Sequence, residues 1–160
     1  MRNVQSRVID APASEIGALL DRFGSADDAL WPSEHWAAAI LDRGLEPGST
    51  GGHGVIRYSV AEYEPGRRLR LKFDPEVGID GFHELIVTPR GEGRSELSHV
   101  IDGTVRGSMR LLWPLAVRWV HEAVLHDLLD NAERETTGTL KNGPARWSPL
   151  VRVLRRIAPD

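Results

Sequence analysis

The chain contains no cysteine, which excludes disulfide bonds, thiolate metal sites and cysteine nucleophiles. It also has no long apolar run. Its most apolar stretch, LLWPLAV at 111–117, is far shorter than the roughly 20 residues that span a bilayer, and Arg110 and Arg118 flank it. The N-terminal MRNVQSRVID holds no apolar segment of signal-peptide length. We therefore expect a soluble cytoplasmic protein.

An excess of basic charge is absent as well. The chain has 20 Lys and Arg residues, 23 Asp and Glu residues and a net charge of −3. A molecule with this balance has no overall positive field that would attract nucleic acid, so we expect no nucleic-acid partner.

Catalytic motifs with a fixed spacing are also missing: there is no serine triad and no paired carboxylate motif. The glycine-rich GSTGGHG at 48–54 precedes a strand pattern, whereas a phosphate-binding loop precedes a helix. We expect His53, within this stretch, to be a turn residue, and we expect the protein to use no cofactor.

The residues that are present indicate one folded domain of antiparallel strands and helices. Of 160 residues, 41% are hydrophobic and 27% are charged, as in ordinary soluble domains. Apolar residues alternate in some segments and recur at helical spacing in others. The predicted order is a strand at 3–9, two short helices at 11–23 and 25–36, five or six further strands from 37 to 103, and a long helix at about 107–136.

The clearest hairpin pattern lies at 55–73. A two-residue Pro-Gly turn predicts three opposed pairs: Tyr58 with Phe73, Val60 with Leu71, and Glu62 with Leu69. All but Glu62 are apolar or aromatic, while the alternate positions carry arginine, lysine and serine. This pattern is typical of an antiparallel sheet with one face toward a core and one face in water.

A second hairpin is predicted at 82–103, around a turn near Glu92, and its apolar face carries two histidines. In the expected register, Leu85 lies opposite His99, and His83 lies opposite Ile101. The two histidines are then diagonal neighbours, roughly 7–8 Å apart at the backbone.

A third histidine faces the same way from the long helix. On a helical wheel, Val117 and Val124 mark the inner face, His121 falls within it, and His126 lies on the opposite side. Three interpretations remain open for the inward histidines: semi-buried structural residues, polar anchors of a ligand pocket, or acid/base groups and metal ligands. The His-x-x-x-His spacing common in zinc sites is absent, so we expect no metal site.

Several motifs together resemble a known family: a first strand leading into IDAPASEIGALLD, a Trp-Pro pair, YSVAEYEPGRRLRLKF, and a long helix ending in HDLLDNAERE. They resemble the SRPBCC superfamily, which includes the birch-pollen allergen and START-type lipid-transfer folds, and within it the polyketide cyclase/dehydrase-like branch. The resemblance implies an α+β helix-grip fold. In that fold a curved antiparallel sheet of about seven strands wraps a long C-terminal helix, with two short helices after the first strand and a hydrophobic cavity between sheet and helix.

Members of this superfamily bind lipids, sterols, hormones, quinones or polyketides, and only some are enzymes. We therefore expect residues 1–136 to hold a small hydrophobic or amphipathic molecule, and we favour a non-catalytic binding protein. The alternative is a polyketide-type cyclase or dehydratase that uses His83 or His99 as the acid/base group. The predicted cavity residues are Tyr58, Val60, Glu62, Leu71, Phe73, His83, Leu85, His99, Val117, His121 and Val124.

Residues 137–160 form a basic amphipathic tail that the resemblance does not cover; it has five Lys and Arg residues and one acid. Ser148 is a suitable N-cap with Pro149 at the first helical position, so a short helix is predicted. We expect this helix to dock on the long helix, with Trp147 near Trp119, and to cover an apolar stripe formed by Leu112, Leu115 and Trp119. A disordered tail, a tail helix on an anionic membrane, which we do not favour, and a stripe that forms a dimer contact are the alternatives, so both monomer and homodimer stay open.

Overall fold

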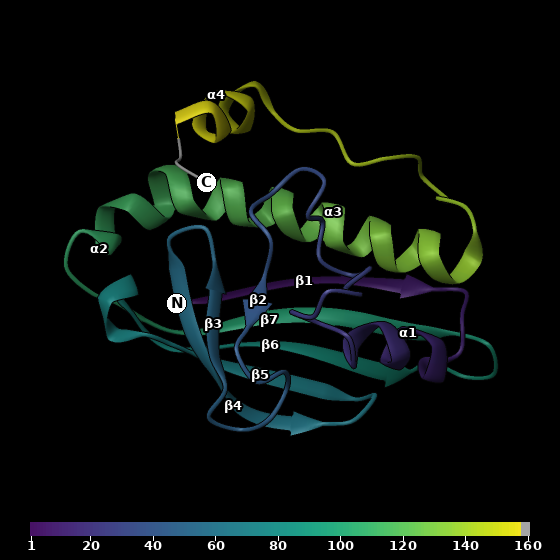
Figure 1. Ribbon diagram of the computed structural model, residues 1–160. Helices are drawn as coiled ribbons and strands as arrows, with labels where there is room; N and C mark the ends of the chain where they lie inside the picture. The colour runs from purple at the N-terminus through teal and green to yellow at the C-terminus, as the bar shows by residue number, and fades with distance from the viewer. Residues whose placement is uncertain (158–160) are drawn as a thin grey trace.

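The computed structural model describes residues 1–157 and shows one seven-stranded antiparallel sheet in the order β1-β7-β6-β5-β4-β3-β2 (Figure 1). The strands are β1 (Arg2–Ile9), β2 (Ile40–Leu41), β3 (Thr50–His53), β4 (Ile56–Glu64), β5 (Arg68–Phe73), β6 (Ile79–Pro89) and β7 (Ser95–Val105). The helices are α1 (Ala13–Leu20), η1 (Pro75–Val77), α2 (Met109–Leu112), η2 (Trp113–Val117), α3 (Arg118–Thr137) and α4 (Pro149–Ile157). The predicted helix-grip α+β fold, with its long C-terminal helix, is confirmed.

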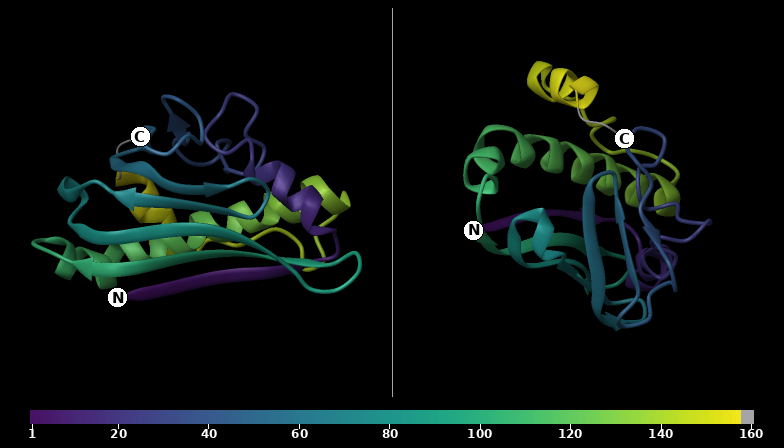
Figure 2. Two further views of the ribbon diagram at one scale, coloured as in Figure 1. Left: turned by 90° about the horizontal axis from the view of Figure 1, so that it is seen from below. Right: turned by 60° about the vertical axis from the view of Figure 1, so that its left-hand side comes forward.

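The core lies between the concave face of the sheet and the long helix, which form two layers (Figure 2). Leu69 and Leu97 from the sheet and Leu125 and Leu128 from α3 are almost fully buried there. Burying each such side chain is worth roughly 1.5–3 kcal/mol before ordering entropy is subtracted. Leu20 of α1 is buried in the same core.

The register of the β6–β7 hairpin is as predicted: Leu85 lies opposite His99, and His83 lies opposite Ile101. Both strands run for 11 residues in regular alternation, so a period of two holds over the whole hairpin.

The predicted pairing and position of Glu62 are wrong. It pairs with Arg70 and not with Leu69, because β4 contains a bulge between Val60 and Glu62. The turn also differs from the two-residue turn expected: Pro65 cannot adopt the positive φ that such a hairpin turn requires, and an extra residue, Arg67, enters the connection. The bulge in β4 offsets this extra residue in the turn, so Val60 and Tyr58 keep their predicted partners beyond the bulge. Glu62, between the turn and the bulge, lies on the outer face instead.

The second short helix predicted after the first strand is absent from the described structure; residues 25–36 form turns. Asp28 explains why. Its carboxylate accepts the backbone N–H groups of Gly24, Leu30 and Trp31 at 2.8–2.9 Å. A side chain that satisfies nearby N–H groups in this way competes with helical hydrogen bonds.

The long helix is interrupted near its start. Residues Trp113–Val117 form a π-helical segment, and Pro114 within it has no N–H to donate to the preceding turn. The Trp119 indole donates to the Pro114 carbonyl at 3.1 Å. The helix then continues to Thr137 and ends at Gly138, whose φ of +74° suits the left-handed cap.

The tail helix forms at α4, where the Ser148 hydroxyl accepts the N–H of Val151 at 3.2 Å. Its position differs from the expectation: Trp147 packs on Trp36, with ring centroids 5.3 Å apart, and not on Trp119. The predicted tail extends to residue 160, and residues 158–160 lie outside the described part of the chain.

Two carboxylates on α3 direct the tail to this side. Asp127 accepts the indole N–H groups of Trp36 at 2.8 Å and Trp147 at 2.9 Å, and Asp130 accepts the backbone N–H of Ala145 at 2.6 Å. The predicted cover of the stripe is therefore wrong: Leu112, Leu115 and Trp119 are 47%, 68% and 42% exposed, respectively.

Candidate functional site

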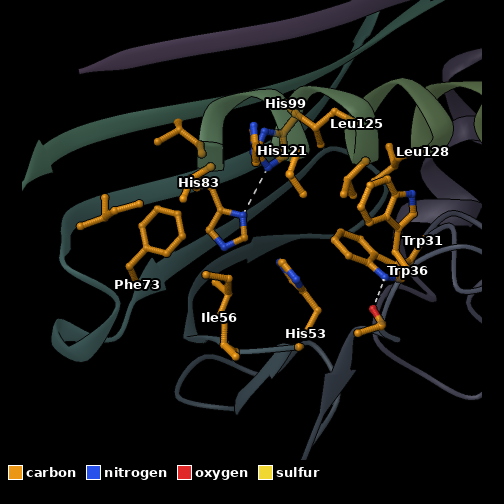
Figure 3. A pocket seen from close by; sticks show the side chains of 18 of the residues that line it. Trp31, Trp36, His53, Ile56, Phe73, His83, His99, His121, Leu125 and Leu128 are labelled. Carbon is orange, nitrogen blue, oxygen red and sulfur yellow. Dashed lines mark hydrogen bonds between the residues drawn. The ribbon is translucent and has the colours of Figure 1, made fainter. Parts of the chain in front are cut away.

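A cavity of about 410 Å³ lies between the concave face of the sheet and the long helix (Figure 3). This size falls within the range of small-molecule sites. Eight of the eleven predicted cavity residues line it: Leu71, Phe73, His83, Leu85, His99, Val117, His121 and Val124. The other three do not. Tyr58 and Val60 are buried in the core, and the Glu62 side chain lies on the outer face of the sheet, paired with Arg68 and Arg70.

Two histidines on the sheet wall form a direct pair. His83 Nδ1 lies 3.3 Å from His99 Nε2, and the two residues are 7% and 5% exposed. The His83 ring also stacks on Phe73, with centroids 4.6 Å apart. Within residues 1–157, neither His83 Nε2 nor His99 Nδ1 has a hydrogen-bond partner. Each imidazole therefore has one nitrogen available for a further hydrogen bond. Because leaving such a buried polar atom unpaired costs about 1–3 kcal/mol, pairing it would be favourable.

His121 extends this cluster from the helix side. Its ring centroid is 5.1 Å from that of His99 and 5.9 Å from that of Trp113. Its Nδ1 is also buried without a partner in the described chain. Figure 3 shows the His83, His99 and His121 side chains close together at one end of the cavity.

His53 also lines the cavity, so the expectation that it is only a turn residue is wrong. It is the last residue of β3 and lies opposite Ile56 across a tight turn. Its ring contacts Trp31 at 4.5 Å and Tyr58 at 5.7 Å between centroids. The signal was present in the sequence: a two-residue turn at Gly54-Val55 places His53 on the same face as Ile56 and Tyr58.

Burial keeps these histidines neutral. Desolvation, followed by repulsion from His121, lowers the pKa of His53 to about 3. Desolvation also lowers the pKa of His121 to about 4. The pKa values of His83 and His99 fall well below 6.5, first because of desolvation and then because of neighbouring histidines. At neutral pH the cluster is a set of uncharged hydrogen-bonding groups.

Tryptophans that the sequence did not assign to the site form another part of the wall. Trp31 and Trp36 come from the turn segment after α1, and Trp113 comes from η2. The Trp31 indole donates to the Ala37 carbonyl at 2.9 Å, and Asp127 fixes Trp36 as described above. The indole N–H groups of Trp31 and Trp36 are therefore occupied, and the three rings offer apolar surface to the cavity.

The tail helix borders the cavity with Leu154, Arg155 and Ile157. The Arg155 guanidinium carbon lies 4.5 Å from the Trp147 ring centroid and 5.5 Å from that of Trp36. The four buried histidines are neutral, and Arg155 is the one lining residue with a fixed charge in the described part of the chain.

Among residues 1–157, no group of three or more histidine, aspartate or glutamate side chains could hold a metal ion. No helix in this range combines the length and apolarity needed to cross a membrane.

Solved structures with the same fold have low sequence identity to this chain. A Thermobifida fusca protein is 20% identical, with a TM-score of 0.62, over 84% of this chain and 94% of that one. CalU16 from Micromonospora echinospora is 18% identical, with a TM-score of 0.59, over 98% of this chain and 83% of that one. Norcoclaurine synthase from Thalictrum flavum, solved with dopamine and hydroxybenzaldehyde, is 11% identical, with a TM-score of 0.61, over 84% of both chains. Identities this low show the shared fold alone.

No curated protein sequence matches the chain significantly. The family model for polyketide cyclase / dehydrase and lipid transport matches residues 1–135. This match spans the whole sheet and nearly all of the long helix, which together enclose the cavity. The chain therefore belongs to the polyketide cyclase / dehydrase and lipid transport family.

Proposed function

We propose that the protein binds a small, largely apolar molecule in the cavity, and that the neutral His83–His99 pair orients it. The observation that carries this proposal is the pair itself: two buried, uncharged imidazoles are joined by one contact in an otherwise mainly apolar cavity. A few fixed polar groups in an apolar pocket are the usual means of orienting a small ligand.

The chemistry of the pair defines what it offers. A neutral imidazole has one donor nitrogen and one acceptor nitrogen. If His83 Nδ1 donates to His99 Nε2, then His83 Nε2 is a free acceptor and His99 Nδ1–H is a free donor. If the proton lies on His99 Nε2, the two free roles are exchanged. In either tautomer the pair presents one donor and one acceptor, which matches a hydroxyl or carbonyl group on the ligand.

The walls define the rest of the ligand. Phe73, Trp31, Trp36 and Trp113 give the cavity flat aromatic surfaces, with aliphatic residues between them. Norcoclaurine synthase, which shares the fold, was solved with two small aromatic molecules. An aromatic or aliphatic body with a neutral polar group at the histidine pair suits such surroundings.

The cyclase or dehydratase alternative is supported less well. A general acid or base works best when its pKa lies near the working pH. The pKa values of His83 and His99 lie well below 6.5, so both imidazoles are weak bases, and neither is in the imidazolium form that acts as a general acid at neutral pH. This favours binding over proton transfer.

The test is native mass spectrometry of the protein purified from its own host, with a matched pair of variants. Val117→Trp places an indole in the cavity wall. Leu115→Trp is the control: it places the same indole two residues away, at a position where the native side chain is 68% exposed. We expect the wild type and Leu115→Trp to retain a small molecule that Val117→Trp has lost. Retention by all three folded proteins would contradict the proposal. A product mass formed by the wild type but not by His99→Asn would instead favour the enzyme.

A further inference from the structure

The described cavity has an uneven charge distribution: no lining residue is a carboxylate, the four buried histidines are neutral, and the single fixed charge, Arg155, lies at the rim. We propose that the ligand is an amphipathic carboxylate, with its apolar body in the cavity and its carboxylate on the Arg155 guanidinium. This inference rests on the proposed function and extends it to the charge of the ligand.

The contacts of Arg155 leave its hydrogen-bond donors available. The guanidinium lies against the rings of Trp147 and Trp36, and cation–π contacts of this kind use no N–H group. No carboxylate within residues 1–157 lies within 4.0 Å of it. Asp127, the acid nearest to these two rings in the hydrogen-bond network, already accepts both of their indole N–H groups. Arg155 is therefore held in place while its N–H groups remain available.

The identity of the charged group follows from this geometry. A cationic ligand would meet Arg155 at the rim and no carboxylate in the wall, so its burial would be unfavourable. A carboxylate can accept two parallel N–H bonds from one guanidinium, and such bidentate pairs are stronger than neutral hydrogen bonds. A carboxylate uses both of its oxygens and its single charge in a pair with one arginine, whereas a phosphate monoester would keep a third oxygen and extra negative charge that Arg155 alone does not match.

Arg155 differs from the other arginines of α4. All three are exposed, but only Arg155 lines the cavity and lies against the rings of Trp36 and Trp147. The helix also lies beyond residues 1–135, which the family model matches. The carboxylate contact therefore lies on a segment outside the residues that the family model matches.

The experiment is a calorimetric titration at neutral pH with three probes that share a decyl chain: decanoate, decyl phosphate and 1-decanol. The proteins are the wild type, Arg155→Gln and Arg156→Gln, which removes the same charge from the neighbouring exposed position. We expect the wild type to bind decanoate about tenfold more tightly than 1-decanol, as one charge-assisted pair at a partly exposed site allows. Arg155→Gln should lose this preference and keep its affinity for 1-decanol, whereas Arg156→Gln should behave as the wild type.

Each other outcome has a definite meaning. Equal loss of decanoate affinity in both variants would show a general effect of net charge and overturn the role of Arg155. Tighter binding of decyl phosphate than of decanoate would overturn the carboxylate. If 1-decanol binds the wild type as tightly as decanoate does, this inference fails and the proposed function stands. If none of the three probes binds the wild type, both fail.

Discussion

His83 and His99 touch across two neighbouring strands: Nδ1 of the first lies 3.3 Å from Nε2 of the second, although 16 residues separate them in sequence. The contact joins one residue of β6 to one of β7, and both rings are buried in the cavity wall. Because the two rings line the cavity and also belong to paired strands, a change in their protonation should affect both the polarity of the cavity and the stability of the sheet.

The first prediction concerns pH. Burial lowers the pKa of His83 and His99 in the folded protein below the ordinary 6.5, so the unfolded chain binds protons that the folded chain does not. Stability should therefore be fully present above about pH 6.5 and fall as the pH decreases below it. Each ring contributes a slope of up to about 1.4 kcal/mol per pH unit until its folded pKa is reached.

Urea unfolding between about pH 7 and about pH 5 measures this slope. We expect His99→Asn to reduce it by the contribution of one proton. Tyr58→Phe is the control, because it removes a buried hydroxyl beside His83. Burial raises the pKa of the Tyr58 hydroxyl, so this group does not titrate in this range. An identical slope in the wild type and His99→Asn would show that His99 binds no additional proton on unfolding, which would contradict a lowered pKa in the folded state.

The second prediction concerns Glu62. Its side chain is 51% exposed and pairs with Arg68 and Arg70 on the outer face. Glu62→Gln should therefore change the free energy of unfolding by less than about 1 kcal/mol, as is usual for exposed ion pairs. It should also leave the affinity for 1-decanol unchanged. A weakened affinity would mean that Glu62 reaches the cavity after all.

These residues show how far sequence patterns could lead. The β6–β7 register was predictable because both strands keep a strict alternation. The bulge beside Glu62 leaves only a weak sign, because it shifts the alternation by one position near the end of the strand, where Tyr63 and not Glu62 takes the inward place. The helix expected at 25–36 failed for a different reason: the Asp28 carboxylate caps a turn, and propensity alone does not reveal which backbone groups a side chain will reach.

The tail shows a second limit. Its helix was predictable from Ser148, Pro149 and the apolar spacing, but its direction depends on where Asp127 meets Trp36 and Trp147. These hydrogen bonds join residues 91 and 20 positions apart, and their geometry exists only once the fold is formed. His53 is the opposite case, because a hairpin at Gly54-Val55 would have placed it correctly.

The third prediction concerns the hold on the tail. Asp127→Ala removes a carboxylate that accepts two indole N–H bonds, each worth at most about 1.5–3 kcal/mol as a bond to a charged group. We expect faster amide hydrogen exchange across residues 145–157 and little change in the central strands. Asp10→Ala, which removes an exposed ion pair with Lys141, is the matched control and should leave this exchange slow. Unchanged exchange in Asp127→Ala would show that other contacts hold α4.

The fourth prediction compares the exposed apolar stripe at Leu112, Leu115 and Trp119 with the buried face of α4. Leu115 is 68% exposed, so Leu115→Ser should change the free energy of unfolding by no more than about 0.5 kcal/mol. Val151, the buried residue of α4, is 4% exposed, and Val151→Ala should cost about 1.5 kcal/mol at ~0.8 kcal/mol for each carbon removed. Thermal and urea unfolding of both variants check this order. A larger loss for Leu115→Ser would mean that another surface covers the stripe.

The central claim, that the His83–His99 pair orients a ligand in the cavity, is tested most directly by nitrogen NMR of the imidazole rings during a titration with 1-decanol. We predict that the His83 Nε2 and His99 Nδ1 resonances shift with saturation, that the exposed His126 resonances stay in place, and that Val117→Trp abolishes the shifts. Saturable binding of 1-decanol with the resonances of both cavity histidines unchanged would contradict the account.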